Sequence, residues 1–213
     1  MSSFHTLPID LVYRILDQIE STSIFLARVV CKRSDIIINS HHSYQTVTAL
    51  ELSHNVLGTD GAYYLATFSQ NNKTIISLIY YFNGIHEQGA QYFGDVLRHN
   101  TTLTSLNIGS NNIDDDSIQH LANGLETNSV QYVLLIFQHH VDIQILTTLI
   151  LCKNKFGHQG FEFLSIALRN NETLNTLDFR ANRSFNDDAQ YLTNALHANT
   201  VNFILCFYAL FAS

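Results

Sequence analysis

The sequence predicts an α/β fold: a leading three-helix module followed by a solenoid of strand-turn-helix repeats. The first observation is an asparagine that recurs in the same apolar setting; the steps from Asn55 to Asn83, from Asn83 to Asn111 and from Asn154 to Asn182 are equal. The second is a change of apolar period, from alternation before the asparagine to steps of about four after it. We expect the helical module in residues 1–45 and about five repeats in residues 46–213.

Each repeat should begin with a strand and end with a helix. Alternating apolar residues such as Leu50 and Leu52 predict a short strand with one buried face. The side-chain amide of the recurring asparagine can satisfy backbone groups of the turn, and successive amides can stack into a ladder. Leu121 and Leu125, four residues apart, indicate a helix with one apolar stripe. Since a single repeat cannot bury its apolar face alone, the repeats should stack cooperatively.

This pattern resembles leucine-rich repeats, in particular the long class found in ribonuclease inhibitor and in the sensor arms of NOD-like receptors. The resemblance implies a concave face made by the variable strand residues, which would bind a protein target. We expect target contacts at Glu51, Ser53, Ile79, Tyr81, Asn107, Asp178 and Arg180, in a row that also includes Gly109, Ile150 and Cys152. The mixed chemistry of this row contains no catalytic constellation, so we predict a non-enzymatic protein without cofactor or metal.

Two segments interrupt the period. Between Asn111 and Asn154, removal of Val130–Gln144 restores the regular spacing of the asparagines. That segment begins with Val and ends with Gln, as a translated intron beginning GT and ending AG would. The tail after Thr200 also begins with Val and loses the polar positions of the repeat. Both segments are either artefacts of a retained intron or genuine features, namely an inserted loop and an irregular C-terminal tail.

The N-terminal residues predict helices with more apolar surface than a module of about 40 residues can bury by itself. The motif Leu7-Pro8-x-Asp10-Leu11, followed by Ile15-Leu16 and by Val30-Cys31-Lys32-Arg33, resembles the F-box. Asp10 stands where that family has Glu, and Ser34 stands where Trp is common.

The F-box resemblance implies docking on a Skp-family adaptor of a cullin ubiquitin ligase, with the repeats holding the protein to be modified. The adaptor-binding positions would be Leu7, Pro8, Leu11, Ile15, Leu16, Val30 and Cys31. One alternative is a leucine-rich-repeat scaffold or sensor whose N-terminal helices only cap the solenoid. Another is a Ran-type GTPase activator, which shares the repeat class, although the required arginine and acidic loop are not found.

Charge and composition exclude several other classes. The net charge of -7, without a Lys/Arg cluster, argues against a nucleic-acid partner. Three widely spaced cysteines fit neither a disulfide framework nor a zinc site, and no apolar stretch is long enough for a membrane span. A cytoplasmic or nuclear protein is therefore expected. We interpret Asp114–Asp116 as helix N-terminal acids rather than as calcium ligands, and the glycosylation-like tripeptides at Asn72, Asn100 and Asn171 as products of the repeat.

Overall fold

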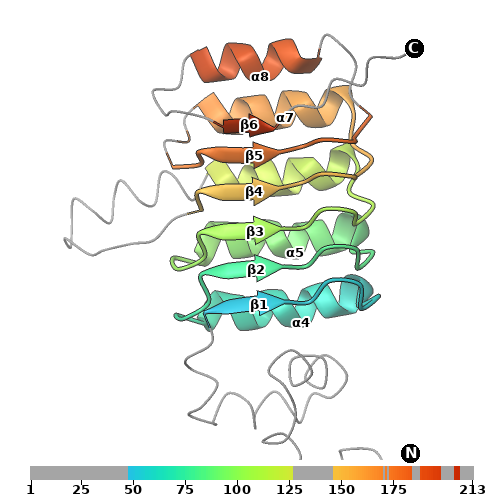
Figure 1. The fold of residues 1–213 in the computed structure, drawn as a ribbon, viewed down its shortest axis with the longest axis vertical. Helices are drawn as coiled ribbons and strands as arrows, with labels where there is room; N and C mark the ends of the chain where they lie inside the picture. Colours follow the sequence, from blue (N-terminus) through green and yellow to red (C-terminus); the bar gives the residue numbers. More distant parts are fainter. Residues whose placement is uncertain are drawn as a thin grey trace, which may run out of the picture.

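The computed structural model describes residues 48–126, 146–169, 171, 173–183, 188–197 and 204–206. In this part of the chain, short parallel strands stack in sequence order into one sheet of order β1-β2-β3-β4-β5-β6. The helices lie behind the sheet, one following each of the first five strands (Figure 1). The α/β architecture of stacked strand-turn-helix units is thus confirmed.

The elements are short and nearly uniform in length. The strands are β1 (Ala49–Glu51), β2 (Ser77–Ile79), β3 (Ser105–Asn107), β4 (Thr148–Ile150), β5 (Thr176–Asp178) and β6 (Ile204–Cys206). The helices are α4 (Gly58–Asn71), α5 (His86–His99), α7 (His158–Arg169) and α8 (Asp188–His197), and residues 115–126 are also helical. Helix α4 packs against α5, and α7 packs against α8.

Strand register follows the period of the sequence. Leu50 pairs with Leu78, and Leu78 pairs with Leu106, each one repeat further along the chain. Leu106 then pairs with Leu149, so β3 and β4 are neighbours as though Val130–Gln144 were absent between them. That segment itself lies outside the described residues. The insertion therefore leaves the stacking of the flanking strands unchanged.

The last strand was not predicted from the sequence. Leu205 of β6 pairs with Leu177 of β5, at the same step along the chain as the pairing of Leu50 with Leu78. Part of the tail after Thr200 therefore extends the sheet. Its three residues lie within the apolar run Phe203–Ala212, where no polar alternation marks a strand.

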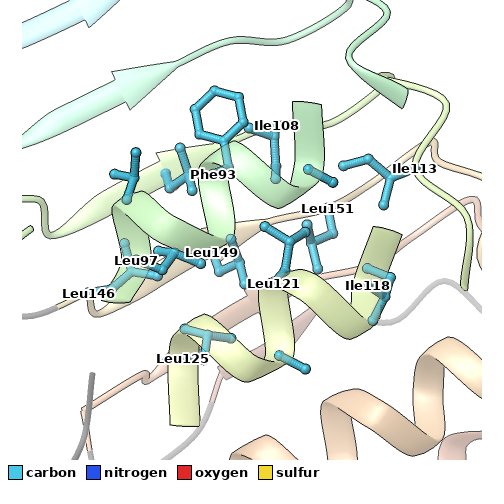
Figure 2. Packing of buried hydrophobic residues seen from close by; sticks show 14 of the residues in the cluster. Phe93, Leu97, Ile108, Ile113, Ile118, Leu121, Leu125, Leu146, Leu149 and Leu151 are labelled. Carbon is cyan, nitrogen blue, oxygen red and sulfur yellow. The ribbon is translucent and has the colours of Figure 1, made fainter. Parts of the chain in front are cut away.

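The core lies between the sheet and the helices. In each of the first five repeats the middle strand residue and the residue two places later are at most 5% exposed. These positions are Leu50, Leu52, Leu78, Tyr80, Leu106, Ile108, Leu149, Leu151, Leu177 and Phe179. Figure 2 shows this core in the middle of the stack, where the helical residues Phe93, Leu97, Leu121 and Leu125 lie in one cluster with Leu149 of β4 and with Leu151, which follows it. Alternation in the sequence therefore correctly identified the buried face.

The asparagine ladder holds the turns after the strands. The amide group of Asn111 donates to the carbonyl oxygens of Tyr80 and Gly109, at 2.7 and 3.0 Å. Its side-chain oxygen accepts from the backbone N–H groups of Asn83 and Gly84, at 2.8 and 2.9 Å. Each such amide thus fills a concave set of N–H groups in the preceding turn.

The ladder changes at its last step. Asn154 accepts from the N–H groups of Asn111 and Ile113, so the pattern continues across the insertion. Asn182 donates to the carbonyl oxygens of Leu151 and Phe179, but its own oxygen is buried without a hydrogen-bond donor among the described residues. The turn of the fourth repeat is therefore built differently from the first three.

A second row of asparagines ends the helices. Asn100 accepts from the N–H groups of Thr102 and Leu103 at 2.9 and 2.7 Å, and Asn171 binds the equivalent groups of Thr173 and Leu174. Asn100 is 5% exposed and Asn171 1% exposed. These amides close the turns between helix and strand, so the asparagines of two glycosylation-like tripeptides have a structural role in the repeat.

Candidate protein-binding face

The register brings the sequence-predicted target residues into one line across the sheet. Glu51 pairs with Ile79, Ile79 with Asn107, Asn107 with Ile150, and Ile150 with Asp178. Each of them directly follows a buried leucine of its strand. Because successive side chains on a strand point to opposite faces, these residues face away from the core, opposite the helices. We call these five residues the first row of the strand face.

A second row lies two residues further along each strand. It consists of Ser53, Tyr81, Gly109, Cys152 and Arg180. Backbone hydrogen bonds join neighbouring members of this row. The residue after one member donates its N–H to the carbonyl of the member in the next repeat; Phe82, which follows Tyr81, donates to Gly109 at 3.0 Å. The strand face is therefore a continuous surface two residues wide, and its members are half-buried except for exposed Glu51 and buried Gly109 and Asp178.

At the β5 end of the strand face, an aspartate and an arginine form a tight ion pair. The Arg180 guanidinium donates from Nε and Nη2 to the two carboxylate oxygens of Asp178, at 2.8 and 2.7 Å. The Asp178 side chain is 8% exposed and the Arg180 side chain is 41% exposed. This geometry fixes the arginine at the surface, where its side chain stays partly exposed to solvent.

In alternate repeats, a polar side chain of the first row accepts a hydrogen bond from the backbone N–H of the residue two places later. A carboxylate oxygen of Glu51 accepts from the N–H of Ser53 at 2.8 Å, and the amide oxygen of Asn107 accepts from the N–H of Gly109 at 3.0 Å. Asp178 accepts from the N–H of Arg180 in the same way. The three polar side chains of the first row are thus pre-ordered, which lowers the entropy lost when a partner binds.

In the middle of the face, an aromatic ring and a thiol close over a glycine. A methyl group added to Gly109 would lie 3.1 Å from Cδ2 of Tyr81 and 3.0 Å from Sγ of Cys152. Burial and the Asp178 carboxylate raise the pKa of the Cys152 thiol, against smaller opposing effects of Arg180 and Lys153. Cys152 is therefore a neutral, half-buried contact rather than an activated nucleophile.

The acidic run after β3 serves the backbone. The Asp114 carboxylate accepts from the N–H and the hydroxyl of Ser117, at 3.1 and 2.6 Å, capping the helix at residues 115–126. Although partial burial opposes them, these hydrogen bonds keep the pKa of Asp114 below its ordinary value. Asp115 accepts from the N–H groups of Gly157 and Gly160. Both carboxylates are thus used as the helix-terminus interpretation requires.

Another polar cluster lies on the helix side, away from the strand face. His158 of α7 contacts the fully buried Asp188 carboxylate of α8 at 2.8 Å, and its other ring nitrogen lies 3.2 Å from the Tyr191 hydroxyl. These contacts join α7 to α8. Within the described residues there is no group of His, Cys, Asp or Glu side chains that could hold a metal ion.

Sequence reasoning missed a set of side chains at the turns. Val56 and Phe82 are 82% and 51% exposed, and Lys153 lies with its ammonium 5.8 Å from the centre of the Tyr81 ring. The sequence did contain a signal for them. Val56 aligns with Gly84 and Asn112 of the next repeats, so an apolar residue stands at a turn position where the other repeats have a small or polar one. The predicted adaptor-binding residues lie outside the described residues: Leu7, Pro8, Leu11, Ile15, Leu16, Val30 and Cys31.

Comparison with known proteins agrees with this architecture. A family model described as "Leucine Rich repeat" matches residues 45–66 and 99–122, and no F-box is detected. No curated protein matches the chain in sequence. None of the helices described is long and apolar enough to cross a membrane.

Two similar solved structures are those of a leiomodin and a tropomodulin. "Leiomodin-1 Actin-Binding Site 2 (ABS2)" is 16% identical, with 77% of this chain and 85% of that chain covered and a TM-score of 0.53. The tropomodulin C-terminal domain of Caenorhabditis elegans is 15% identical, with 77% and 91% covered and a TM-score of 0.52. At these identities the likeness concerns the fold alone. Together with the repeat match, the register and the ladder, it shows that this chain contains leucine-rich repeats.

Proposed function

We propose that the chain is a non-catalytic protein-interaction subunit whose strand face binds a segment of a target protein. The observation that carries the proposal is the strand register, which aligns Glu51, Ile79, Asn107, Ile150 and Asp178 in one row. The row combines apolar side chains with charged and amide groups, a composition suited to a protein surface with mixed chemistry.

The ion pair supports recognition of a polar group beside an apolar one. Arg180 is held by Asp178 yet is 41% exposed, and Ile150 is the neighbour of Asp178 on β4. Arginine fixed in this way can bind a carboxylate or carbonyl of a partner without losing further rotamer freedom. The strand face would therefore contribute specificity through Arg180 and contact area through the two isoleucines.

A matched pair of substitutions tests this proposal. Ile150 lies on the strand face, whereas Ile166 of α7 is 44% exposed on the helix side of the same repeat. We expect that Ile150→Lys removes the partners that co-purify with the wild-type chain from its own cells, and that Ile166→Lys retains them. Equal retention by both folded variants would contradict the assignment of the strand face.

The finer proposal is that the target is presented to a cullin ubiquitin ligase. Its support is the N-terminal motif Leu7-Pro8-x-Asp10-Leu11 with Val30-Cys31-Lys32-Arg33, which resembles the F-box. Leu11→Asp should abolish binding of a purified Skp-family adaptor while Ile150→Lys leaves it unchanged. No adaptor binding by the folded wild-type chain would remove the ligase proposal and leave a stand-alone repeat scaffold. Because leiomodin-1 carries a named actin-binding site, actin is a defined bait for the same assay.

A further inference from the structure

A pocket lies at the turns that follow the strands, beside the second row of the strand face. Its volume is about 200 Å³, and its lining includes Val56, Phe82, Gly84, Ser110, Asn112 and Lys153. We call it the turn pocket. Because pockets for small molecules usually measure about 300–1,000 Å³, this one is suited to a single side chain of a larger partner.

Two apolar side chains of the pocket are displayed at a conformational cost. Val56 has φ 52° and Phe82 has φ 55°, in the left-handed region that disfavours bulky and especially β-branched residues. The equivalent position in the other repeats carries His54, Ser110, Lys153 and Ala181, all with positive φ, so the turn fixes this conformation whatever the side chain. None of these four residues is a large apolar one, and Val56 stands where the next two repeats have Gly84 and Asn112. Exposed large apolar side chains that are held in this conformation indicate a binding role.

The pocket's charge is positive. Lys153 is the ionisable residue of its lining, and its ammonium lies 5.8 Å from the centre of the Tyr81 ring. The ring holds the ammonium by a cation–π contact, which leaves its charge available at the surface. Since the lining contains no carboxylate, a negative group from a partner would meet Lys153 without a competitor in the pocket.

Ring contacts support the apolar wall of the pocket, and the polar wall carries a hydrogen-bond donor. The His54 ring lies 5.4 Å from the Tyr81 ring and 5.1 Å from the Phe82 ring, between centroids. Asn112, with φ 63°, stands at the position that Val56 and Gly84 take in the preceding repeats. It can offer its side-chain amide to a bound carboxylate or peptide group.

We propose that the turn pocket binds an internal peptide segment of the partner in which an apolar side chain stands next to an Asp or Glu. The apolar side chain lies against Val56 and Phe82, and the carboxylate pairs with the Lys153 ammonium and the Asn112 amide. This inference rests on the proposed function, since it gives the chemistry of a segment that would pass from the strand face over the turns.

Selection from a random octapeptide library displayed on phage tests the pocket with the full chain as bait. Selected sequences are then made as amidated, acetylated peptides, so that side chains supply the only carboxylates. We expect the selected peptides to carry Asp or Glu within two residues of an apolar side chain. Lys153→Glu should weaken their binding about three- to fivefold in a fluorescence polarisation assay, as expected for one exposed ion pair with an apolar neighbour.

Controls separate charge, shape and the strand face. Lys73→Glu makes the same charge change at the opposite turns, where Lys73 lies beside Thr101, and it should leave peptide binding unchanged. Phe82→Gly suits φ 55° and should remove the apolar contact without harming the fold. No enriched peptide, enrichment without carboxylates, or equal affinity for wild type and Lys153→Glu would overturn the inference.

The result also distinguishes the two proposals. If Ile150→Lys abolishes target binding while Lys153→Glu has no effect on the selected peptides, the turn pocket fails and the strand face stands. If the reverse holds, the strand face fails and the pocket stands.

Discussion

The guanidinium of Arg180 binds both carboxylate oxygens of Asp178, at 2.8 and 2.7 Å, across the two rows of the strand face. Arg180→Ala should destabilise the fold by about 1 kcal/mol, because it removes the counter-charge of a side chain only 8% exposed. The loss of stability should be this small because the arginine side chain is 41% exposed and solvent screens the ion pair. A double-mutant cycle with Asp178→Asn, measured by urea unfolding, checks it. A coupling free energy near zero would contradict the pairing.

The reactivity of Cys152 should depend on pH through its raised pKa. Burial and the Asp178 carboxylate disfavour the thiolate, so alkylation by iodoacetamide at pH 7.5 should be slower than for a free cysteine. The alkylation rate should continue to increase at pH values above the ordinary pKa of a cysteine thiol. Asp178→Asn removes one of the two causes and leaves the opposing charge of Arg180, so it should accelerate the reaction. Peptide mapping by mass spectrometry follows Cys152 separately from Cys31 and Cys206. An unchanged rate in the variant would show that Asp178 does not act on the thiol.

Ladder asparagines should differ in importance with burial. Asn111→Ala removes two acceptor and two donor contacts in a fully buried turn and should cost about 2–4 kcal/mol. Asn55→Ala removes two donor contacts at an exposed end of the ladder, where water can replace them, and should cost at most about 1 kcal/mol. Urea unfolding midpoints with equal m values provide the comparison. Similar losses in both variants would argue against a ladder that is strongest in its buried centre.

Val56 offers a stabilising substitution. Its side chain is 82% exposed and its φ is 52°, so Val56→Asn, which copies Asn112, should raise the free energy of unfolding by about 1 kcal/mol. Val56→Thr keeps the β-branch and should not stabilise. Because Val56 lines the turn pocket, the asparagine variant should also bind the selected peptides more weakly. A gain in stability from threonine equal to that from asparagine would contradict strain as the cause.

Periodicity predicts most of this fold because each repeat uses the same local solution. The regular spacing of the asparagines predicts the strands, the ladder and the residues of the strand face. It also locates the insertion at Val130–Gln144, and β3 and β4 pair in the regular register on either side of that segment. Asp178 and Arg180 could be assigned to one face from their separation of two residues. Their bidentate geometry depends on side-chain rotamers, which the pattern does not contain.

The remaining features arise where tertiary structure overrides local preference. Val56 and Phe82 adopt left-handed turn conformations because neighbouring repeats fix the backbone there, against the propensity of their side chains. Lys153 reaches Tyr81 from two repeats away, past Gly109 and Ser110, a contact that requires the stacking itself. Strand β6 was missed because its pairing with β5, rather than an alternating pattern, defines it.

Site-directed photo-crosslinking tests the central claim most directly. Benzoylphenylalanine is placed at Ile150 on the strand face or at Ile166 on α7, in chains shown to be folded by circular dichroism, and irradiated in the chain's own cells. We predict a discrete crosslinked protein from position 150 and none from position 166. A crosslinked partner from position 166, with none from position 150, would contradict a strand face that binds the target.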